Sequence, residues 1–293
     1  MENTNLKKEI SLFMATMLVC GNMIGSGVFM LPATLAQVSG PGATIIAWIL
    51  TTIGSVLIAV SFANLGTKYP ETGGAYYYTR EAFGDFAGFL SAWLYWNGSW
   101  IGNAAIIVAI TSYASAVVPI LNKPIVSIIF SRAMLWVFTI VNIAGVKKAG
   151  QIQAFVTVFK IVFFAFFIIV AFMNFDSINI TPMFPEGKGL STIPLAATST
   201  LWAFIGLESA TVTAGEMKDP EKNVKKSTIY GLIIAAAIYL LISIASMGAM
   251  NNLELAQSTA PLTDILTNAL GNWIGKALTI GVVICILGTV IGW

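Results

Sequence analysis

The sequence has no histidine, only two cysteines and few charged residues. Zinc sites are built from clustered cysteine and histidine, whereas Cys20 and Cys285 each stand alone in an apolar segment. Buried free cysteines behave as small hydrophobic residues. We therefore expect no metal site and no cofactor, and no disulfide between the two thiols.

The formal net charge is also small, because 15 lysines and arginines stand against 13 acidic residues, which leaves +2. Nucleic-acid binding requires a large basic field, so we expect no nucleic-acid partner. No nucleophile, base and orienting group occur together in the sequence, which argues against an enzyme. The short alternating segments of an outer-membrane barrel are absent as well.

The chain instead has an excess of apolar residues. Of its 293 residues 57% are hydrophobic and 10% are charged, against roughly 25% charged in soluble domains, and the mean hydropathy is +0.84. Several runs exceed the ~20 residues that cross a bilayer as a helix. We predict an all-α polytopic membrane protein with one transmembrane domain over residues 1–293 and the lipid bilayer as its surroundings. The eight predicted spans are residues 10–35, 42–67, 84–118, 124–144, 150–173, 192–215, 227–250 and 273–293.

The basic residues of the connections predict the orientation. One side of the predicted bilayer carries Lys7, Lys8, Lys68, Arg80, Lys147, Lys148, Lys218, Lys222, Lys225 and Lys226, and the other carries Lys123, Lys188 and Lys276. Cytoplasmic connections are enriched in lysine and arginine. The N-terminus is therefore predicted to be cytoplasmic.

The first span contains the polar and small residues GNMIGSGVF at positions 21–29. Glycine in a membrane helix serves close helix packing or marks a helix that is unwound at mid-membrane, as in many transporters. The GSG triplet favours unwinding, because it tolerates unusual backbone angles and lets a ligand approach the backbone.

The sixth span has a matching feature in LWAFIGLES, where Gly206 precedes Glu208 by two residues. Interruptions in the first and sixth spans are typical of two inverted repeats with a site between them. We predict a first five-helix repeat over residues 10–173 and an incomplete second repeat over residues 192–293.

Two broken helices suit a ligand with a carboxylate and an ammonium group. Backbone amides at Ser26 and Gly27 would start the second half of the first helix and could receive a carboxylate. Freed carbonyls near Met23, Trp202 and Ile205 could accept hydrogen bonds from an ammonium group.

Two charged residues are predicted to lie deep in the membrane. Glu208 is expected on an ion, proton or substrate pathway, and the alternative is a structural carboxylate satisfied by neighbouring hydroxyl groups. Lys160 could occupy a cation position near the first helix, or it could pair with Glu208.

Tyr95, Ser99 and Asn103 recur at intervals of four residues in the third span, so they form one polar stripe. We expect this stripe to face a cavity. For Asn103 alone, hydrogen bonding between helices is an equal alternative.

Five motifs resemble the basic amino acid/polyamine antiporters of the APC superfamily, and among these most closely the bacterial arginine/agmatine antiporters. They are GNMIGSGVFMLPA (21–33), GGAYYYTREAFG (73–84), LYWNGSWIGN (94–103), LWAFIGLESA (201–210) and KDPEKNV (218–224). The resemblance implies the LeuT-like inverted-repeat fold of that superfamily, with twelve helices of which helices 1 and 6 are discontinuous. By that measure the chain is expected to be C-terminally truncated, within helix eight.

The resemblance also implies roles for individual residues. The substrate-binding residues would be Met23, Ser26, Gly27, Ser99, Asn103, Ile106, Trp202, Ile205 and Trp293. In that set, Ser99 and Asn103 would meet the guanidinium group, Ile106 would line the pocket, and Trp293 would stack on the substrate. Glu208 with Tyr95 would form an inner gate, and Tyr76 would take part in pH sensing.

The implied function is exchange of extracellular arginine for intracellular agmatine by alternating access, in the bacterial inner membrane, with a contribution to acid resistance. Two departures bear on it: Lys160 stands where such antiporters carry an aliphatic residue and proton-coupled or L-type relatives carry lysine, and Lys225 replaces a usual proline. The alternatives are a proton-coupled or exchange transporter of lysine, ornithine or a neutral amino acid, a non-transporting scaffold, or an inactive truncated remnant. A homodimer is left open.

Overall fold

The computed structural model describes residues 7–25, 27–143, 145–271 and 274–293. Within them the regular structure is helical, apart from an isolated bridge between Ile10 and Met217. The α-helices are α1 (Leu12–Met23), α2 (Gly27–Val38), α3 (Pro41–Lys68), α4 (Ala75–Phe83), α5 (Asp85–Val117), α6 (Pro124–Ile143), α7 (Val146–Met173), α8 (Ile193–Trp202), α9 (Ser209–Val212), α10 (Pro220–Ala249), α11 (Asn252–Gln257), α12 (Pro261–Leu270) and α13 (Gly275–Gly292). Short 3-10 helices cover Pro119–Asn122, Ser177–Ile180, Leu190–Thr192 and Ala214–Glu216.

The prediction of an all-α polytopic membrane protein is confirmed. Among the described residues, five segments are long and apolar enough to cross a membrane, namely Leu12–Val38, Pro41–Lys68, Pro124–Ile143, Lys147–Met173 and Pro220–Ala249. Helices α5, with 33 residues, and α13, with 18, coincide with the predicted third and eighth spans. The sixth predicted span, residues 192–215, is divided between α8 and the short α9.

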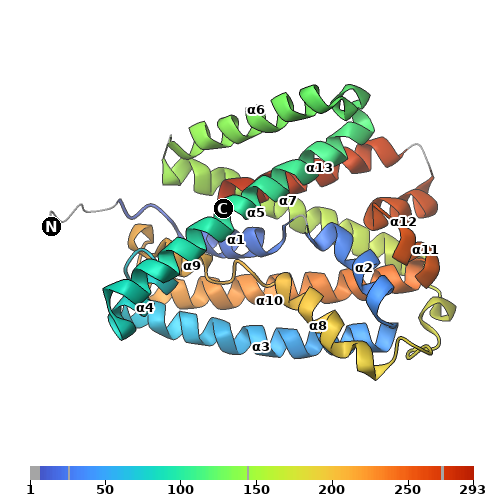
Figure 1. The fold of residues 1–293 in the computed structure, drawn as a ribbon, viewed down its shortest axis with the longest axis horizontal. Coiled ribbons are helices and arrows are strands. Elements are labelled where there is room, and N and C mark those ends of the chain that lie inside the picture. Colours follow the sequence, from blue (N-terminus) through green and yellow to red (C-terminus); the bar gives the residue numbers. More distant parts are fainter. Residues whose placement is uncertain (1–6, 26, 144, 272–273) are drawn as a thin grey trace.

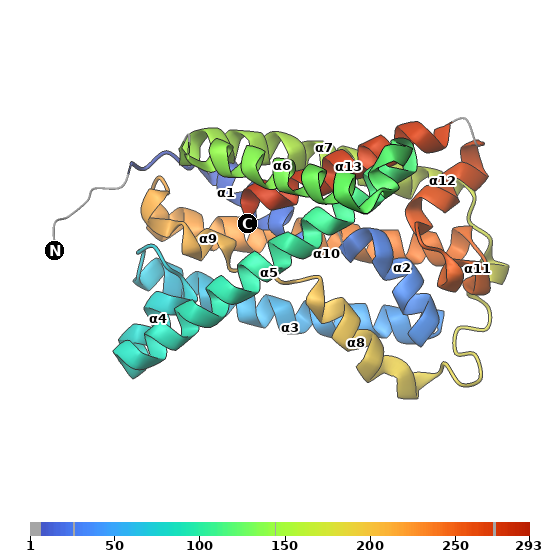
Figure 2. The same ribbon diagram turned by 45° about the horizontal axis from the view of Figure 1, so that its top comes forward.

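Two long helices, α3 and α10, run side by side along one flank of the molecule (Figure 1). Helix α1 packs on α10 and α7, and α5 crosses the bundle diagonally and packs on α13 (Figure 2). Helix α6 lies at the edge, and none of its residues is buried. An apolar helix without a buried face is expected to contact lipid.

Aromatic residues from α3, from α10 and from the segment just after α8 pack together beside the middle of the bundle. The ring of Trp48 stacks on Tyr239 with centroids 5.3 Å apart, and Phe204 meets Tyr239 edge-on at 5.8 Å. The Trp48 indole nitrogen donates to Ser243 Oγ at 2.8 Å. This cluster holds the segment that follows α8 against α10.

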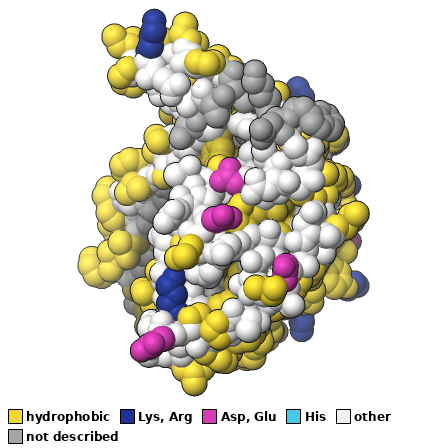
Figure 3. Space-filling model, turned by 90° about the vertical axis from the view of Figure 1, so that its right-hand side faces the viewer, with side chains coloured by type: hydrophobic (Ala, Val, Ile, Leu, Met, Phe, Trp, Pro, Cys, Tyr) yellow, Lys and Arg dark blue, Asp and Glu magenta, His cyan; other side chains and the backbone are white. Residues whose placement is uncertain are grey.

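The lysines at the start of α10 lie at the end of the molecule opposite α11 and α12. Figure 3 views the end that carries α11 and α12, where acidic and basic side chains lie scattered among polar and apolar atoms. The opposite end carries the start of α10, with its lysines at positions 222, 225 and 226.

Candidate functional site

The first span is interrupted between Met23 and Gly27, as predicted. Helix α1 ends at Met23, the following Ile24 has non-helical angles (φ −77°, ψ 74°), and α2 begins at Gly27. Ser26, which was predicted to bind a carboxylate, lies outside the described residues. We call this interruption the first break.

The glycines near the first break have different physical roles. A Cβ added to Gly21 would lie 2.3 Å from Gln153 Nε2, so Gly21 permits the close approach of α1 and α7. A Cβ on Gly25 or Gly27 would meet its nearest atom at 3.5 or 3.9 Å, which is ordinary contact. Close packing therefore explains Gly21, whereas a Cβ at Gly25 or Gly27 would fit without a clash.

The second break separates α8, which ends at Trp202, from α9, which begins at Ser209. Gly206 lies inside it with φ +109°, a conformation that side chains disfavour. A Cβ on Gly206 would lie 3.0 Å from the backbone of both Asn22 and Met23. The absence of a side chain at Gly206 therefore allows the two breaks to touch.

Lys160, on α7, holds the end of α1. Its side chain is fully buried (0% exposed), and its Nζ donates to Gly21 O at 3.0 Å, Ile24 O at 2.8 Å and Thr289 Oγ1 at 2.7 Å. An ammonium group has three N–H donors, so each has an acceptor. The carbonyl end of a helix also attracts a positive charge. Of the two alternatives for Lys160, the position beside the first helix is the one that the structure shows.

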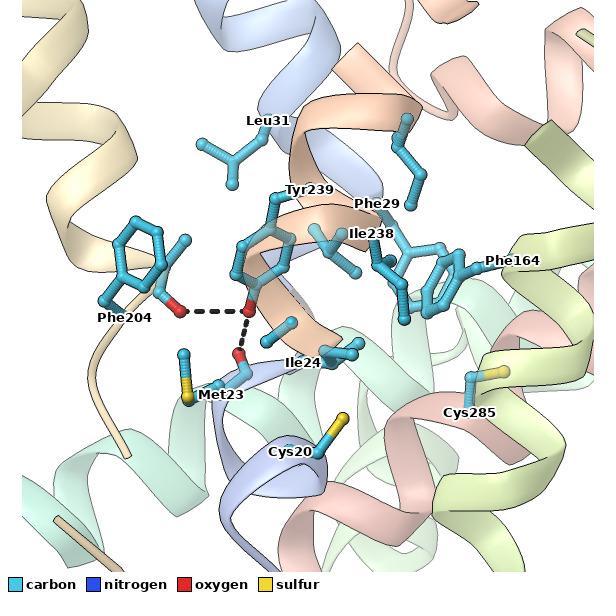
Figure 4. Packing of buried hydrophobic residues seen from close by; sticks show 14 of the residues in the cluster. Cys20, Met23, Ile24, Phe29, Leu31, Phe164, Phe204, Ile238, Tyr239 and Cys285 are labelled. Atoms are coloured by element: carbon cyan, nitrogen blue, oxygen red, sulfur yellow. Dashed lines mark hydrogen bonds between the residues drawn. The ribbon is translucent and has the colours of Figure 1, made fainter. Parts of the chain in front are cut away.

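Tyr239, on α10, links the ends of α1 and α8. Its buried hydroxyl group lies 2.5 Å from Met23 O and 2.9 Å from Ala203 O, as the dashed lines in Figure 4 mark. A hydroxyl group has one proton, so it donates to one of these carbonyls at a time. Sequence reasoning missed this residue, and the signal for it is a tyrosine inside an apolar helix, since buried tyrosines seek a polar partner.

Asn22 connects the two breaks through its side chain. Its Nδ2 donates to Ser209 Oγ at 2.9 Å, and its Oδ1 accepts from Gln153 Nε2 at 3.5 Å. Its backbone carbonyl accepts from the Trp293 indole nitrogen at 3.3 Å. Asn22 was also missing from the predicted site, although it stands in the GNMIGSGVF stretch.

A cavity of about 680 Å³ lies between the breaks and α5. Among the residues predicted for the site, Met23, Gly27, Tyr95, Ser99, Ile106, Trp202, Ile205, Glu208 and Trp293 line it. Asn22, Ser55, Tyr239 and Thr289 add polar groups to walls that are mostly apolar. Small-molecule sites have volumes of roughly 300–1,000 Å³ and few convergent polar groups, so the cavity can hold one small molecule.

Glu208 lies where the second break meets α5. Its Oε2 accepts from Gly206 N at 3.0 Å, and its Oε1 accepts from Tyr95 OH at 3.3 Å. The centroid of the Tyr95 ring in turn lies 6.4 Å from the centroid of the Trp293 ring. No ion pair of Glu208 with Lys160 is found among the described residues.

Other predicted site residues lie outside the cavity lining. The Asn103 Oδ1 atom is buried without a hydrogen-bond partner among the described residues, and Asn103 does not line the cavity. Tyr76 lies on α4, where its backbone amide donates to Gly73 O. Lys160 lies behind the cavity wall, against α1 and α13.

Comparison with known families gives a match to the amino acid permease model over residues 10–293. Among curated proteins the chain is 32% identical to a putative arginine/ornithine antiporter of Bacillus subtilis, over 98% of the chain and 67% of that protein. It is 31% identical to an arginine/ornithine antiporter of Pseudomonas aeruginosa, over 98% and 61% of the two. It is 34% identical to a cadaverine/lysine antiporter of Escherichia coli, over 91% and 60%. The chain thus spans about three fifths to two thirds of these relatives.

Among solved structures the chain is similar to Mhp1, a nucleobase-cation-symport-1 family transporter, with a TM-score of 0.69. The match covers 100% of this chain and 67% of that one at 11% sequence identity. This similarity supports the LeuT-like transporter fold alone. The limits of the two predicted repeats stay a prediction.

Proposed function

The chain belongs to the amino acid permease family, and on this premise we propose that the protein is an antiporter of basic amino acids. The relatives at 31–34% identity are named as arginine/ornithine and cadaverine/lysine antiporters. Family and names both support transport and not enzymatic chemistry. As the finer proposal, the exchanged pair is extracellular arginine and intracellular agmatine. The second candidate is arginine and ornithine, which the names of two relatives favour.

The observation that carries the proposal is the meeting of helix ends of opposite polarity in one cavity. The start of α2 at Gly27 and the carbonyl ends of α1 and α8 all reach it. A helix start attracts a carboxylate, and a helix end attracts an ammonium group. An α-amino acid carries both groups on one carbon atom, so we propose that Ser26 and Gly27 hold the carboxylate, and carbonyls at Met23, Trp202 and Ile205 the ammonium.

The distal cationic group of the substrate is proposed to lie between aromatic rings. Trp202 and Trp293 line the cavity, and 69% of Trp202 is exposed, so its ring is free to take up a ligand. A cation over an indole face is stabilised by the ring quadrupole. Ser99 adds a hydroxyl group on α5, Asn103 is the next polar group on that helix, and Ile106 adds an apolar contact.

Alternating access requires that substrate stabilise the outward and inward states differently. The Glu208–Tyr95 hydrogen bond joins the second break to α5 across the cavity. We propose that it acts as the inner gate. Tyr76, on α4, is proposed to take part in pH sensing. The N-terminus is proposed to lie in the cytoplasm, in agreement with the basic residues of the connections.

Lys160 is proposed to replace a bound cation at the end of α1. Its ammonium group supplies a fixed positive charge to Gly21 O and Ile24 O. A carrier with such a fixed charge needs no coupling ion at this position. In the alternative, a proton-coupled transporter, Lys160 would release and regain a proton during the cycle.

Counterflow in liposomes tests the exchange. Vesicles containing the purified protein are loaded with agmatine, ornithine, cadaverine or buffer, and uptake of labelled arginine is followed. We expect internal agmatine to accelerate uptake strongly over buffer. Faster uptake with ornithine would select the second candidate pair, and uptake that is independent of the internal solute would refute exchange.

Trp202→Ala is expected to weaken arginine binding about tenfold or more, because the cation loses a ring worth up to about 2 kcal/mol. Isothermal titration calorimetry on the purified variant measures the loss. The control is Trp100→Ala, since Trp100 is a half-exposed residue of α5 that does not line the cavity. If the Trp202 and Trp100 variants bind arginine with equal affinity, Trp202 is not part of the substrate site.

Glu208→Ala is expected to slow exchange while leaving arginine affinity within a few-fold of the original. In this proposal the carboxylate bonds to Tyr95 in the gate and does not contact the substrate. Its loss should therefore affect the rate of exchange more than the affinity for arginine. Counterflow rates and calorimetry separate the two effects. Glu254→Ala, on α11, serves as the control. A Glu208 variant with normal turnover would exclude the gate.

Tyr239→Phe keeps the ring against Trp48 and Phe204 and removes one hydroxyl group. The hydrogen bond contributes about 0.5–1.5 kcal/mol, so arginine affinity is expected to fall about threefold to tenfold as the ends of α1 and α8 separate. The matched control is Tyr230→Phe, because Tyr230 is half-exposed on the same helix. Unchanged affinity for the Tyr239 variant would mean that the hydroxyl does not position the carbonyls.

A further inference from the structure

A second hollow, apart from the cavity, lies between the end of α3 and the start of α10. Its volume is about 460 Å³. Asn64 and Thr67 line it from α3, and Glu221, Lys222, Lys225, Lys226, Ile229 and Tyr230 line it from α10. We propose that this groove, which we call the α3–α10 groove, binds an anionic phospholipid.

The charge of the groove is suited to a phosphate group. Lys225 and Lys226 follow Lys222 at intervals of three and four residues, so both lie on the same side of α10 as Lys222. All three are exposed, and no described residue forms an ion pair with them. Glu221 supplies the one carboxylate of the lining, which leaves an excess of two positive charges.

The helix direction adds to this attraction. The three lysines lie within the first two turns of α10, which begins at Pro220. The start of a helix carries a partial positive charge from its unpaired amides. An anion in the α3–α10 groove would therefore be favoured by both side chains and backbone.

The apolar surface beside the lysines identifies the ligand as a lipid. One turn further along α10 lie Ile229 and the half-exposed Tyr230, followed by Ile233, which is 56% exposed. Tyrosine is enriched at the level of lipid headgroups. Charge, tyrosine and apolar surface thus follow one another along α10 in the order of phosphate, glycerol and acyl chain in a phospholipid.

Clusters of basic residues beside a transmembrane helix attract anionic lipids. The α3–α10 groove adds a defined hollow to such a cluster, so binding is expected to be site-specific and saturable. It does not depend on which amino acid the cavity holds. Arginine binding and transport by the protein can therefore be measured separately.

Native mass spectrometry of the purified protein tests the proposal. Phosphatidylglycerol and phosphatidylcholine with identical acyl chains are titrated against the protein, and bound lipids are counted. We expect phosphatidylglycerol to bind at least tenfold more tightly to one site. Lys225→Gln with Lys226→Gln should remove this preference, and it should also weaken as salt is added.

The matched control is Lys147→Gln with Lys148→Gln, an adjacent pair of exposed lysines at the start of α7. Both double variants lower the net charge by two, so they differ only in where the charges are removed. The proposal would be overturned if the Lys225→Gln, Lys226→Gln variant kept the preference for phosphatidylglycerol. It would also be overturned if the control variant lost that preference to the same extent. Competition by soluble glycerol phosphate at the same concentration as the lipid would instead indicate a free-phosphate site and would also overturn it.

Discussion

Lys160→Met is expected to reduce exchange to about one hundredth of its rate or less and to lower the melting temperature. The substitution keeps an unbranched side chain of similar length but removes all three donors, so Gly21 O, Ile24 O and Thr289 Oγ1 each lose the ammonium group as a partner. Ile24 O keeps the hydrogen bond from Thr289 Oγ1 at 3.3 Å. A buried polar group without its partner costs about 1–3 kcal/mol. The end of α1 would then reorganise. Counterflow and thermal unfolding in detergent measure the two effects.

Thr289→Val is the graded control for Lys160→Met. It removes one acceptor of the ammonium group and the 3.3 Å hydrogen bond from Thr289 Oγ1 to Ile24 O, but it leaves both carbonyls bonded to the ammonium group. We therefore expect a loss of about 1 kcal/mol. Wild-type stability and exchange in Lys160→Met would contradict the role of Lys160. Intact arginine exchange with a changed proton dependence would instead favour the proton-coupled alternative.

Gly206→Ala is expected to abolish measurable arginine binding. The residue has φ +109°, and its Cβ would lie 3.0 Å from the backbone of Asn22 and Met23. Strained backbone of this kind costs about 1–3 kcal/mol, and the contact can be relieved only by separating the two breaks. Calorimetric titration with arginine, together with the melting temperature, measures the effect.

Gly54→Ala, on α3, is the control for this substitution. Its Cβ would meet nothing within 4 Å, and alanine favours a helix over glycine. We expect Gly54→Ala to bind arginine normally and to unfold at an equal or higher temperature. Normal binding by Gly206→Ala would show that the contact between the two breaks is dispensable.

The helical spans and both breaks could be predicted from the sequence because they depend on local signals. Runs of apolar residues determine the spans, and small residues beside polar ones mark the interruptions at Gly27 and Gly206. The extent of the second break could not be predicted. The apolar pattern suggested a helix to residue 215, but α9 covers only Ser209–Val212.

The contacts across the site depend on residues far apart in the sequence. Lys160 meets Gly21 and Thr289, which lie 139 and 129 positions away. Tyr239 meets Met23 across 216 positions. Periodicity gives the face of a helix but not its partner, which is why Tyr239 was missed and why the two alternatives for Lys160 could be separated only by the fold.

The packing role of Gly21 is hidden in the sequence for the same reason. Gly21, Gly25 and Gly27 stand in one motif, and the GSG triplet favours unwinding without indicating a separate role for Gly21. Only the position of Gln153 on α7 shows that Gly21 belongs to a helix contact. The polar stripe on α5 likewise could not be resolved from its spacing alone. Tyr95 and Ser99 line the cavity, whereas Asn103, one turn further, does not.

A structure of the purified protein with arginine bound tests the central proposal most directly. We predict that the carboxylate lies against the backbone amides at the start of α2, and the α-ammonium against the carbonyl ends of α1 and α8. Arginine found elsewhere, or held in this cavity by side chains alone with its two charged groups away from both breaks, would contradict the account.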